Sequence, residues 1–303
     1  MKLGFLTAAL PGLNLEEVAR WAGESGFGML EIACWPAGKA ERRYAGVSHI
    51  DVASLDAAGA KRINALIRDN GLEISSLGYY PNPLSADQAH NDAAIAHLKK
   101  VVDAAALLGV EIVGTFIGAD QRKSADENME TFARVWPPIV RYAGERGVKI
   151  AIENCPMLWE DTWPGGSNVA YSPAIWRRMF EIIPDDNFGL NYDPSHLVWQ
   201  FIDYLRPIAE FKERIFHVHA KDMEIEHEML YQDGVLGCGF RWAIPRLPGL
   251  GEVRWERFIA ALYATGYDFV VSIEHEDRKF EGTEELVKRG FYLSRNVLAP
   301  YIV

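Results

Sequence analysis

The sequence is poor in cysteine and has no long apolar run. Its three cysteines, Cys34, Cys155 and Cys238, are widely spaced and form no Cys-x-x-Cys pair, which argues against a disulfide framework and a cysteine-based zinc site. No apolar run approaches the ~20 residues that a membrane-spanning helix needs, and no basic segment followed by an apolar one opens the chain. We therefore expect a cytoplasmic protein of a reducing compartment with no membrane partner.

Positive charge is also scarce. The 303 residues include 31 Lys and Arg against 42 Asp and Glu, which gives a formal net charge of -11. An acidic protein repels the phosphates of nucleic acids and of anionic lipids. The expected partner is a small molecule, neutral or cationic, and not a nucleic acid.

What the sequence does have is a regular alternation of strand-like and helix-like segments. Runs rich in Val, Ile and Leu predict strands at 2–7, 29–33, 72–77, 110–116, 148–153, 188–193, 214–219 and 269–274. Helical patterns are found at 15–25, 54–70, 86–108, 126–146, 203–212, 255–265 and 283–298, and one more begins at Ser172-Pro173. Pro137 and Pro138 should kink or divide the fourth helix.

This alternation predicts the fold class. Eight strand–helix units in one chain point to an α/β protein, a (β/α)8 TIM barrel. The 49% hydrophobic content is enough for one large core, and no linker or low-complexity stretch divides the chain. We therefore expect a single domain over 1–303, with an insertion at about 222–252 between the seventh strand and the seventh helix.

Four of the predicted strands end on side chains that can bind a metal. These are Glu153, Asp193, His219 and Glu274. Because the C-terminal ends of barrel strands meet at one face, the four side chains should lie together. Three carboxylates and one imidazole favour a hard divalent cation, for which we expect Mn²⁺, with Mg²⁺ or Co²⁺ as alternatives.

Such a site suits chemistry beside a carbonyl group. The cation would leave coordination positions for two oxygens of an α-hydroxyketone and would stabilise the enediolate that forms when the neighbouring carbon loses a proton. With Glu153 and Glu274 on opposite sides of that carbon, one could remove the proton and the other return it to the opposite face, which inverts the centre. Transfer of the proton between adjacent carbons would instead give isomerisation, and these residues do not decide between the two.

The order of the motifs resembles a known superfamily. Glu153 on the fifth strand, Asp193-x-x-His196 on the sixth, His217-x-His219 on the seventh and Glu274 on the eighth are similar to the xylose isomerase-like TIM barrels. Within them, the chain most resembles the sugar phosphate isomerase/epimerase group that includes the ketose 3-epimerases for tagatose and allulose. The stretch 246–255, with its Pro-Gly-x-Gly sequence, is similar to the loop before their seventh helix.

This likeness covers essentially the whole chain and has implications for single residues. It implies one divalent cation on the four predicted ligands, and Glu153 and Glu274 as the acid/base pair. His196 would contact the substrate or support the metal ligands.

Two positions depart from the ketose epimerases. The arginine six positions beyond their strand-seven histidine is Ile225 here, and the glutamate six beyond their strand-five glutamate is Trp159, with Glu160 next. Nearby cations could replace that arginine: Lys221, Arg241 and Arg246. The resemblance therefore defines the metal site better than it defines the sugar substrate.

Other side chains at strand ends are candidate substrate contacts. Glu31 and Lys221 offer polar groups, and Asp222 could support His219. Aromatic rings can stack on the C–H faces of a sugar, and the candidates are Trp35, Tyr79, Phe116, Trp159 and Trp163. His217 is expected to pack on the face of its strand opposite to His219, and His275 to point outward.

Three classes of function share this pattern. The leading one is a metal-dependent isomerase or epimerase acting on a small keto sugar. The second is a lyase or dehydratase that performs β-elimination on a keto-inositol or a 3-keto-glycoside with the same metal site. The third, a hydrolase of the endonuclease IV type, needs further histidines at strand ends where Gly78-Tyr79 and Thr115-Phe116 stand.

The insertion at about 222–252 is rich in glycine and aromatic residues. It could act as a lid or as a contact between subunits. We expect a homo-oligomer, either a dimer or a tetramer.

Overall fold

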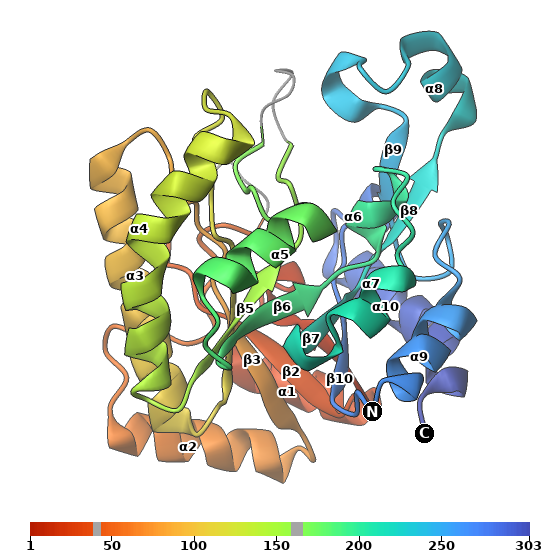
Figure 1. Cartoon of the computed structure of the whole chain (residues 1–303). Helices are drawn as coiled ribbons and strands as arrows, with labels where there is room; N and C mark the ends of the chain where they lie inside the picture. The colour runs from red at the N-terminus through yellow and green to blue at the C-terminus, as the bar shows by residue number, and fades with distance from the viewer. Residues whose placement is uncertain (39–43, 159–165) are drawn as a thin grey trace.

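The computed structural model describes residues 1–38, 44–158 and 166–303, so Trp159, Glu160 and Trp163 lie outside the described residues. Eight parallel strands close into a barrel in the order β1-β10-β7-β6-β5-β4-β3-β2, which confirms the predicted TIM barrel (Figure 1). The barrel strands are β1 Lys2–Leu6, β2 Met29–Ala33, β3 Glu73–Gly78, β4 Ile112–Thr115, β5 Lys149–Glu153, β6 Phe188–Tyr192, β7 Ile215–Ala220 and β10 Val270–Ile273.

Helices surround the barrel. They are α1 Leu15–Glu24, α2 Ala57–Asp69, α3 Gln88–Leu108, α4 Ala125–Gly144, α5 Pro173–Ile182, α6 Ser195–Val198, α7 Arg206–Glu210, α9 Trp255–Ala264 and α10 Glu284–Leu298. Short 3-10 turns are found at Thr7–Ala9, Lys212–Arg214, Cys238–Phe240, Arg278–Phe280 and Ala299–Tyr301. Among the described residues, no helix combines the length and the apolar character that crossing a membrane requires.

Two helices differ from the sequence prediction. Helix α4 runs through Pro137 and Pro138 without being divided, because Trp136, Ile139 and Val140 on either side of the prolines are fully or almost fully buried against the barrel. Burial of these large side chains outweighs the lost backbone hydrogen bonds. The short helix α6, which directly follows Asp193-Pro194, was not predicted.

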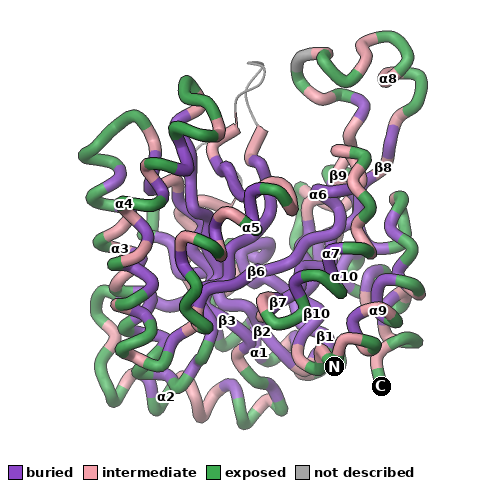
Figure 2. Tube along the Cα trace, in the orientation of Figure 1, coloured by how far each residue is buried: buried purple, intermediate pink, exposed green. Residues whose placement is uncertain are grey.

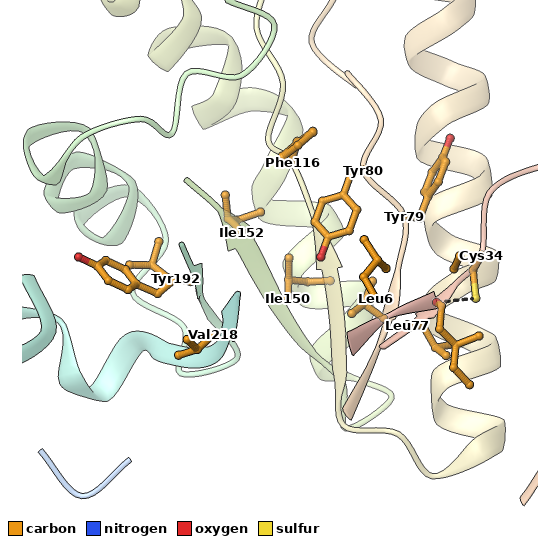
Figure 3. Packing of buried hydrophobic residues seen from close by; sticks show 14 of the residues in the cluster. Leu6, Cys34, Leu77, Tyr79, Tyr80, Phe116, Ile150, Ile152, Tyr192 and Val218 are labelled. Atoms are coloured by element: carbon orange, nitrogen blue, oxygen red, sulfur yellow. Dashed lines mark hydrogen bonds between the residues drawn. The ribbon is translucent and has the colours of Figure 1, made fainter. Parts of the chain in front are cut away.

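The main core lies between the barrel strands and the surrounding helices. Figure 2 shows buried residues along the strands and exposed ones on the outer sides of the helices. Figure 3 shows part of the buried cluster, with Leu6 on β1, Leu77 on β3, and Ile150 and Ile152 on β5. Because the strands are packed from outside, their C-terminal ends are held in fixed positions at one mouth of the barrel.

The segment after β7 forms a projection that we call the hairpin arm, residues 222–252. Its strands β8 Asp222–Ile225 and β9 Ala243–Arg246 pair antiparallel, with α8 His227–Asp233 between them. The arm extends away from the barrel (Figure 1). It has a small core of its own around Met223, Ile225 and Trp242.

Candidate metal centre

The structure brings the four predicted metal ligands together. Glu153 ends β5, Asp193 follows β6, His219 is the last but one residue of β7, and Glu274 follows β10. All four are buried, and one ligand atom from each lies within 4.8 Å of the others. The parallel barrel thus places residues from four separate stretches of chain at one point.

Three polar atoms of this cluster lack hydrogen bonds. Glu153 Oε1, Asp193 Oδ2 and His219 Nδ1 are buried and make none to any residue in the described parts of the chain. His219 Nδ1 lies 3.6 Å from Glu153 Oε1 and 3.5 Å from Glu274 Oε2. Buried polar atoms are normally hydrogen-bonded, and these atoms have the hard donor character that divalent cations prefer. The residues therefore fit a divalent cation.

His219 is oriented by a carboxylate on its other side. Its Nε2 lies 2.7 Å from Glu31 Oε2, and Glu31 also accepts hydrogen bonds from the Tyr80 hydroxyl and from Ser272 Oγ. A metal-binding histidine commonly donates its other ring N–H to such a carboxylate, which fixes the ring and its tautomer. In this arrangement, Nε2–H faces Glu31 and Nδ1 faces the cluster.

Glu31 was predicted as a candidate substrate contact, but the structure places it beside His219 and away from the cavity. It is fully buried beneath His219, and it is not among the described residues that line the cavity above. Burial alone would raise the pKa of Glu31, but the charge of His219 and its hydrogen bond hold that pKa below its ordinary value.

The predicted orientation of His217 was wrong. Side chains two residues apart on a strand share a face, so His217 points into the barrel like His219. Its Nδ1 lies 2.9 Å from Asn191 Oδ1 and its Nε2 3.1 Å from Ser75 Oγ. Burial lowers the pKa of His217 to about 4, so its ring is neutral. His275 does point outward, and its ring packs against Phe291 of α10 at 5.3 Å.

A buried ammonium group lies among the carboxylates. Lys221 Nζ is 2.5 Å from Glu274 Oε2, 3.2 Å from Asp193 Oδ2 and 3.2 Å from Glu276 Oε2. Burial would lower the pKa of Lys221, but these carboxylates, Glu274 first, raise it well above its ordinary value. The charged side chain thus balances part of the negative charge of the cluster.

Loop contacts hold the ends of β5 and β6 together. The side chain of Asn154 donates to Asp193 O and accepts from Asp193 N, both at 2.8 Å. Ser195 N donates to Asp193 Oδ1 at 2.8 Å, which leaves Oδ2 facing the cluster. His196 Nε2 lies 3.4 Å from Asp193 Oδ2 and 3.5 Å from Glu153 Oε1, so His196 stands beside the predicted ligands.

The sequence suggested that Asp222 could support His219, but the structure shows that it does not. It anchors the hairpin arm by accepting hydrogen bonds from the backbone of Met223, Gly249 and Val253 and from Trp255 Nε1. The support of His219 comes from Glu31 instead.

Comparison with known proteins agrees with this arrangement. The model of the xylose isomerase-like TIM barrel family matches residues 19–296. The chain belongs to this family. The family resemblance inferred from the motifs is thereby confirmed.

Two curated relatives and two solved structures illustrate the likeness. The uncharacterized protein YfiH of Bacillus subtilis (strain 168) is 25% identical over 325 residues, 91% of this chain and 93% of that protein. An inosose dehydratase of Geobacillus thermodenitrificans (strain NG80-2) is 29% identical over 132 residues, 42% of this chain and 44% of the relative. The structure of an IOLI protein with a bound zinc atom superposes with a TM-score of 0.72 at 18% identity, covering 100% of this chain and 99% of the other. D-psicose 3-epimerase of Clostridium cellulolyticum H10, solved with D-tagatose, gives 0.68 at 16% identity, covering 98% and 99%. At these identities the structures show a shared fold.

In this member of the family, part of the cluster opens onto a cavity of about 690 Å³. Glu153, Glu274, His196 and Lys221 line it. Of the predicted aromatic contacts, Trp35 and Phe116 are also on its wall. Tyr79 packs against the ring of His97 at 4.6 Å, and the residue on the wall is its neighbour Tyr80.

Two of the cations proposed to replace the missing arginine also line this cavity. Arg246 is paired with Glu224 and lies 3.3 Å from Asp277. Arg241 lies 2.7 Å from Asp233 and is exposed. Both guanidinium groups therefore already have carboxylate partners in the hairpin arm or beside it.

Several residues of the site were missed in the sequence. Asn191 stands two residues before Asp193, so strand periodicity alone could have placed it on the inward face. The other missed residues line the cavity but follow strand ends or helix α6, or belong to the arm, where no strand period applies: Tyr80, Trp199, Phe240 and Glu276.

Proposed function

We propose that this protein is a divalent-metal-dependent sugar isomerase or epimerase that acts on a small keto sugar. The observation that supports the proposal is the convergence of Glu153, Asp193, His219 and Glu274 at one point, where Glu153 and Glu274 line a cavity. Buried acidic groups that share a cleft with a metal-binding imidazole are typical of a reaction site.

The cluster would hold the cation through Glu153, Asp193, His219 and Glu274. We propose Mn²⁺, with Mg²⁺ or Co²⁺ as alternatives, because these cations accept oxygen ligands together with imidazole. When bound, the cation would supply positive charge beside a substrate oxygen that becomes negative as the adjacent carbon loses its proton. Glu31 would keep the ring of His219 in the orientation that offers Nδ1.

Glu153 and Glu274 are the proposed acid/base pair. Burial would raise the pKa of Glu153, but the rings of His196 and His219, 3.5 and 3.6 Å from its Oε1, and the charge of Lys221 hold that pKa well below its ordinary value, so the side chain is a carboxylate that can accept a proton. Glu274 accepts a hydrogen bond from Lys221 at 2.5 Å. One glutamate would take the proton from the carbon beside the carbonyl, and the other would return one.

The remaining cavity residues would bind the sugar. His196 and Lys221 offer hydrogen-bond donors to hydroxyl or carbonyl oxygens, and Trp35 and Phe116 offer apolar faces for C–H groups. Arg246 would contribute from the base of the arm, with its orientation set by Glu224 and Asp277.

Elimination is the second candidate, and the similarity to an inosose dehydratase favours it. Removal of the same proton gives the same carbanion, which expels a leaving group when the next carbon carries one. A keto-inositol or a 3-keto-glycoside would then lose water or an alcohol instead of being reprotonated.

Proton exchange tests the proposal directly. Metal-loaded protein is incubated in D₂O with ketoses, 3-keto-glycosides and an inosose, the metal is chelated, and proton NMR is recorded. We expect deuterium at one carbon beside the carbonyl, and the product then separates epimerase, isomerase and lyase.

Two variants control this experiment. Glu153→Gln should abolish the exchange, and its metal content is measured in parallel so that loss of the cation is recognised. Glu73→Gln replaces an exposed carboxylate at the start of β3 and should exchange like the wild type. Absence of exchange with every compound, in protein that carries the metal, would contradict the proposal.

We also propose that the protein is a homodimer or homotetramer. Tyr231, Val235 and Leu236 in the hairpin arm are exposed apolar side chains, and such groups favour burial against another subunit. A monomeric mass in light scattering would remove this proposal.

A further inference from the structure

A second cavity adjoins the one above the candidate metal centre. Its volume is about 480 Å³, and it lies between the start of α4, the loop after β5 and the segment after α6. Pro156, Leu158 and Trp199 line both cavities, so the two spaces adjoin at these side chains. The wall of the second cavity is mostly apolar, whereas charged side chains such as Glu153, Lys221 and Glu274 line the first.

Aromatic rings form one side of the second cavity. Phe201 stacks on Trp242, with ring centres 6.0 Å apart and planes at 10°. Trp242 in turn meets Trp199 edge-on at 6.3 Å and 67°. Trp242 is buried, but Phe201 is 62% exposed. The stack therefore ends in an aromatic surface that is open to solvent at the cavity.

Backbone strain links the two cavities. Among the residues that the structure describes, four that are not glycine have a positive φ: Tyr44 at 67°, Met157 at 54°, Phe201 at 56° and Phe240 at 46°. Three of them line the first cavity, and Phe201 lines the second. A left-handed conformation is costly for a residue with a Cβ atom and is found preferentially where a site imposes it. Each of the four strained residues thus lines one of the two adjoining cavities.

Of the polar side chains that line the second cavity, the amides of Asn128, Asn168 and Gln200 already donate to backbone carbonyl groups, while Gln121, Lys123 and Tyr171 are also on its wall. The amide of Asn168 donates to Glu153 O and Cys155 O, that of Asn128 donates to Asp120 O and Ser124 O, and that of Gln200 donates to Tyr171 O and His196 O. A second sugar ring would need partners for its hydroxyl groups. A flat apolar group needs none.

We propose that the second cavity binds the part of the substrate that does not react, and that this part is a flat apolar or aromatic group joined to the sugar. The substrate class is then a keto-glycoside, such as a 3-keto-glycoside, of an aromatic or apolar alcohol, with its keto sugar at the metal centre. Each cavity falls within the about 300–1,000 Å³ of a pocket for one drug-sized ligand, and together they exceed the needs of a single sugar ring. The proposal rests on the proposed function only for the identity of the reacting end.

Binding of matched glycosides tests this subsite without any turnover. Isothermal titration of metal-loaded protein compares 4-nitrophenyl and methyl glucosides in both anomeric series. We expect the aryl compound to bind about tenfold more tightly in at least one series, since stacking and burial of the ring add to the sugar contacts. Phe201→Gly removes the ring while accepting the positive φ, so the variant should fold, and it should lose most of this preference.

Tyr231→Ala is the matched control, because Tyr231 of the hairpin arm is also an exposed aromatic side chain, 82% exposed, and lines neither cavity. It should keep the aryl preference. Equal affinities in both series, or a preference that survives Phe201→Gly, would overturn the proposal. A change of mass in light scattering on Phe201→Gly without any aryl preference would also overturn it, by assigning this surface to a second copy of the chain.

The two proposals fail in different ways. If the metal-centre chemistry were wrong, deuterium exchange would be absent while the aryl preference persisted. If the subsite were wrong, exchange would persist while methyl and aryl glycosides bound alike.

Discussion

The two ends of the barrel each carry a cavity of similar size, but their charges are held in opposite ways. At the N-terminal ends of the strands, a cavity of about 760 Å³ is lined by residues such as Glu73, Lys149 and Phe216. The ion pairs there are exposed: Lys149 and Glu111, 3.3 Å apart, have side chains 43% and 74% exposed. At the C-terminal ends, Glu153, Asp193 and Lys221 are at most 2% exposed.

This difference teaches that cavity volume does not distinguish the two ends of the barrel, whereas the burial of charge does. An exposed ion pair is hydrated and contributes little to stability. A buried carboxylate without a hydrogen bond is costly, so it persists where a cation or a reaction requires it. Variants at either end of the barrel test whether this difference in the burial of charge matters.

The largest effect is expected from Glu274→Gln. The amide keeps the shape of the side chain but cannot exchange a proton, so kcat should fall by about 10²–10⁴. Steady-state kinetics on the substrate found by deuterium exchange measure this, with Glu73→Gln as the control at the opposite end. Activity within about twofold of the wild type would exclude Glu274 from the acid/base pair.

Lys221→Met is expected to have the next largest effect. Without the ammonium, Asp193 and Glu274 lose their buried countercharge, and the unfolding free energy of the metal-free protein should drop by about 3–5 kcal/mol. Denaturant unfolding with and without metal measures this. The loss should be smaller with metal, since a cation restores the balance of charge, and an equal loss in both forms would show that Lys221 only packs.

Glu31→Gln should act through the metal alone. Glu31 does not line the cavity but fixes the ring of His219, and loss of such a carboxylate typically lowers metal affinity about 10–100-fold. Titration calorimetry with Mn²⁺ measures the change, and Glu111→Gln serves as the matched surface control. An unchanged dissociation constant in folded protein would mean that His219 needs no such support.

The strand ends could be predicted because two simple rules determine them, namely the common direction of parallel strands and the alternation of side chains along each strand. Parallel barrel strands all point the same way, so residues that end them converge, and this placed Glu153, Asp193, His219 and Glu274 at one mouth. The alternation of side chains along the strand, with a period of two, also applies to His217. It places His217 on the same inward face as His219, whereas the sequence prediction placed it on the opposite face. Asn191 would have followed from the rule applied correctly.

The contacts between distant segments could not be predicted in this way. Glu31 and His219 are 188 positions apart, and they meet only because closure of the barrel brings β2 and β7 to the same interior. Tyr79 and Tyr80 follow the end of β3, where alternation stops, so periodicity cannot decide which ring faces the cavity. The side chain of Lys221 has several carboxylates within reach, and only the packed structure selects among them.

The smallest effect is expected at the N-terminal end of the barrel. Lys149→Met and Glu111→Gln, made singly and together, should show a coupling energy below about 1 kcal/mol in denaturant unfolding, because water and salt screen an exposed pair. The coupling should vanish at high ionic strength, and kcat should not change in any of the three variants. A coupling well above this range, or a loss of activity, would show that the N-terminal cavity takes part in function and that burial of charge is not what distinguishes the two ends.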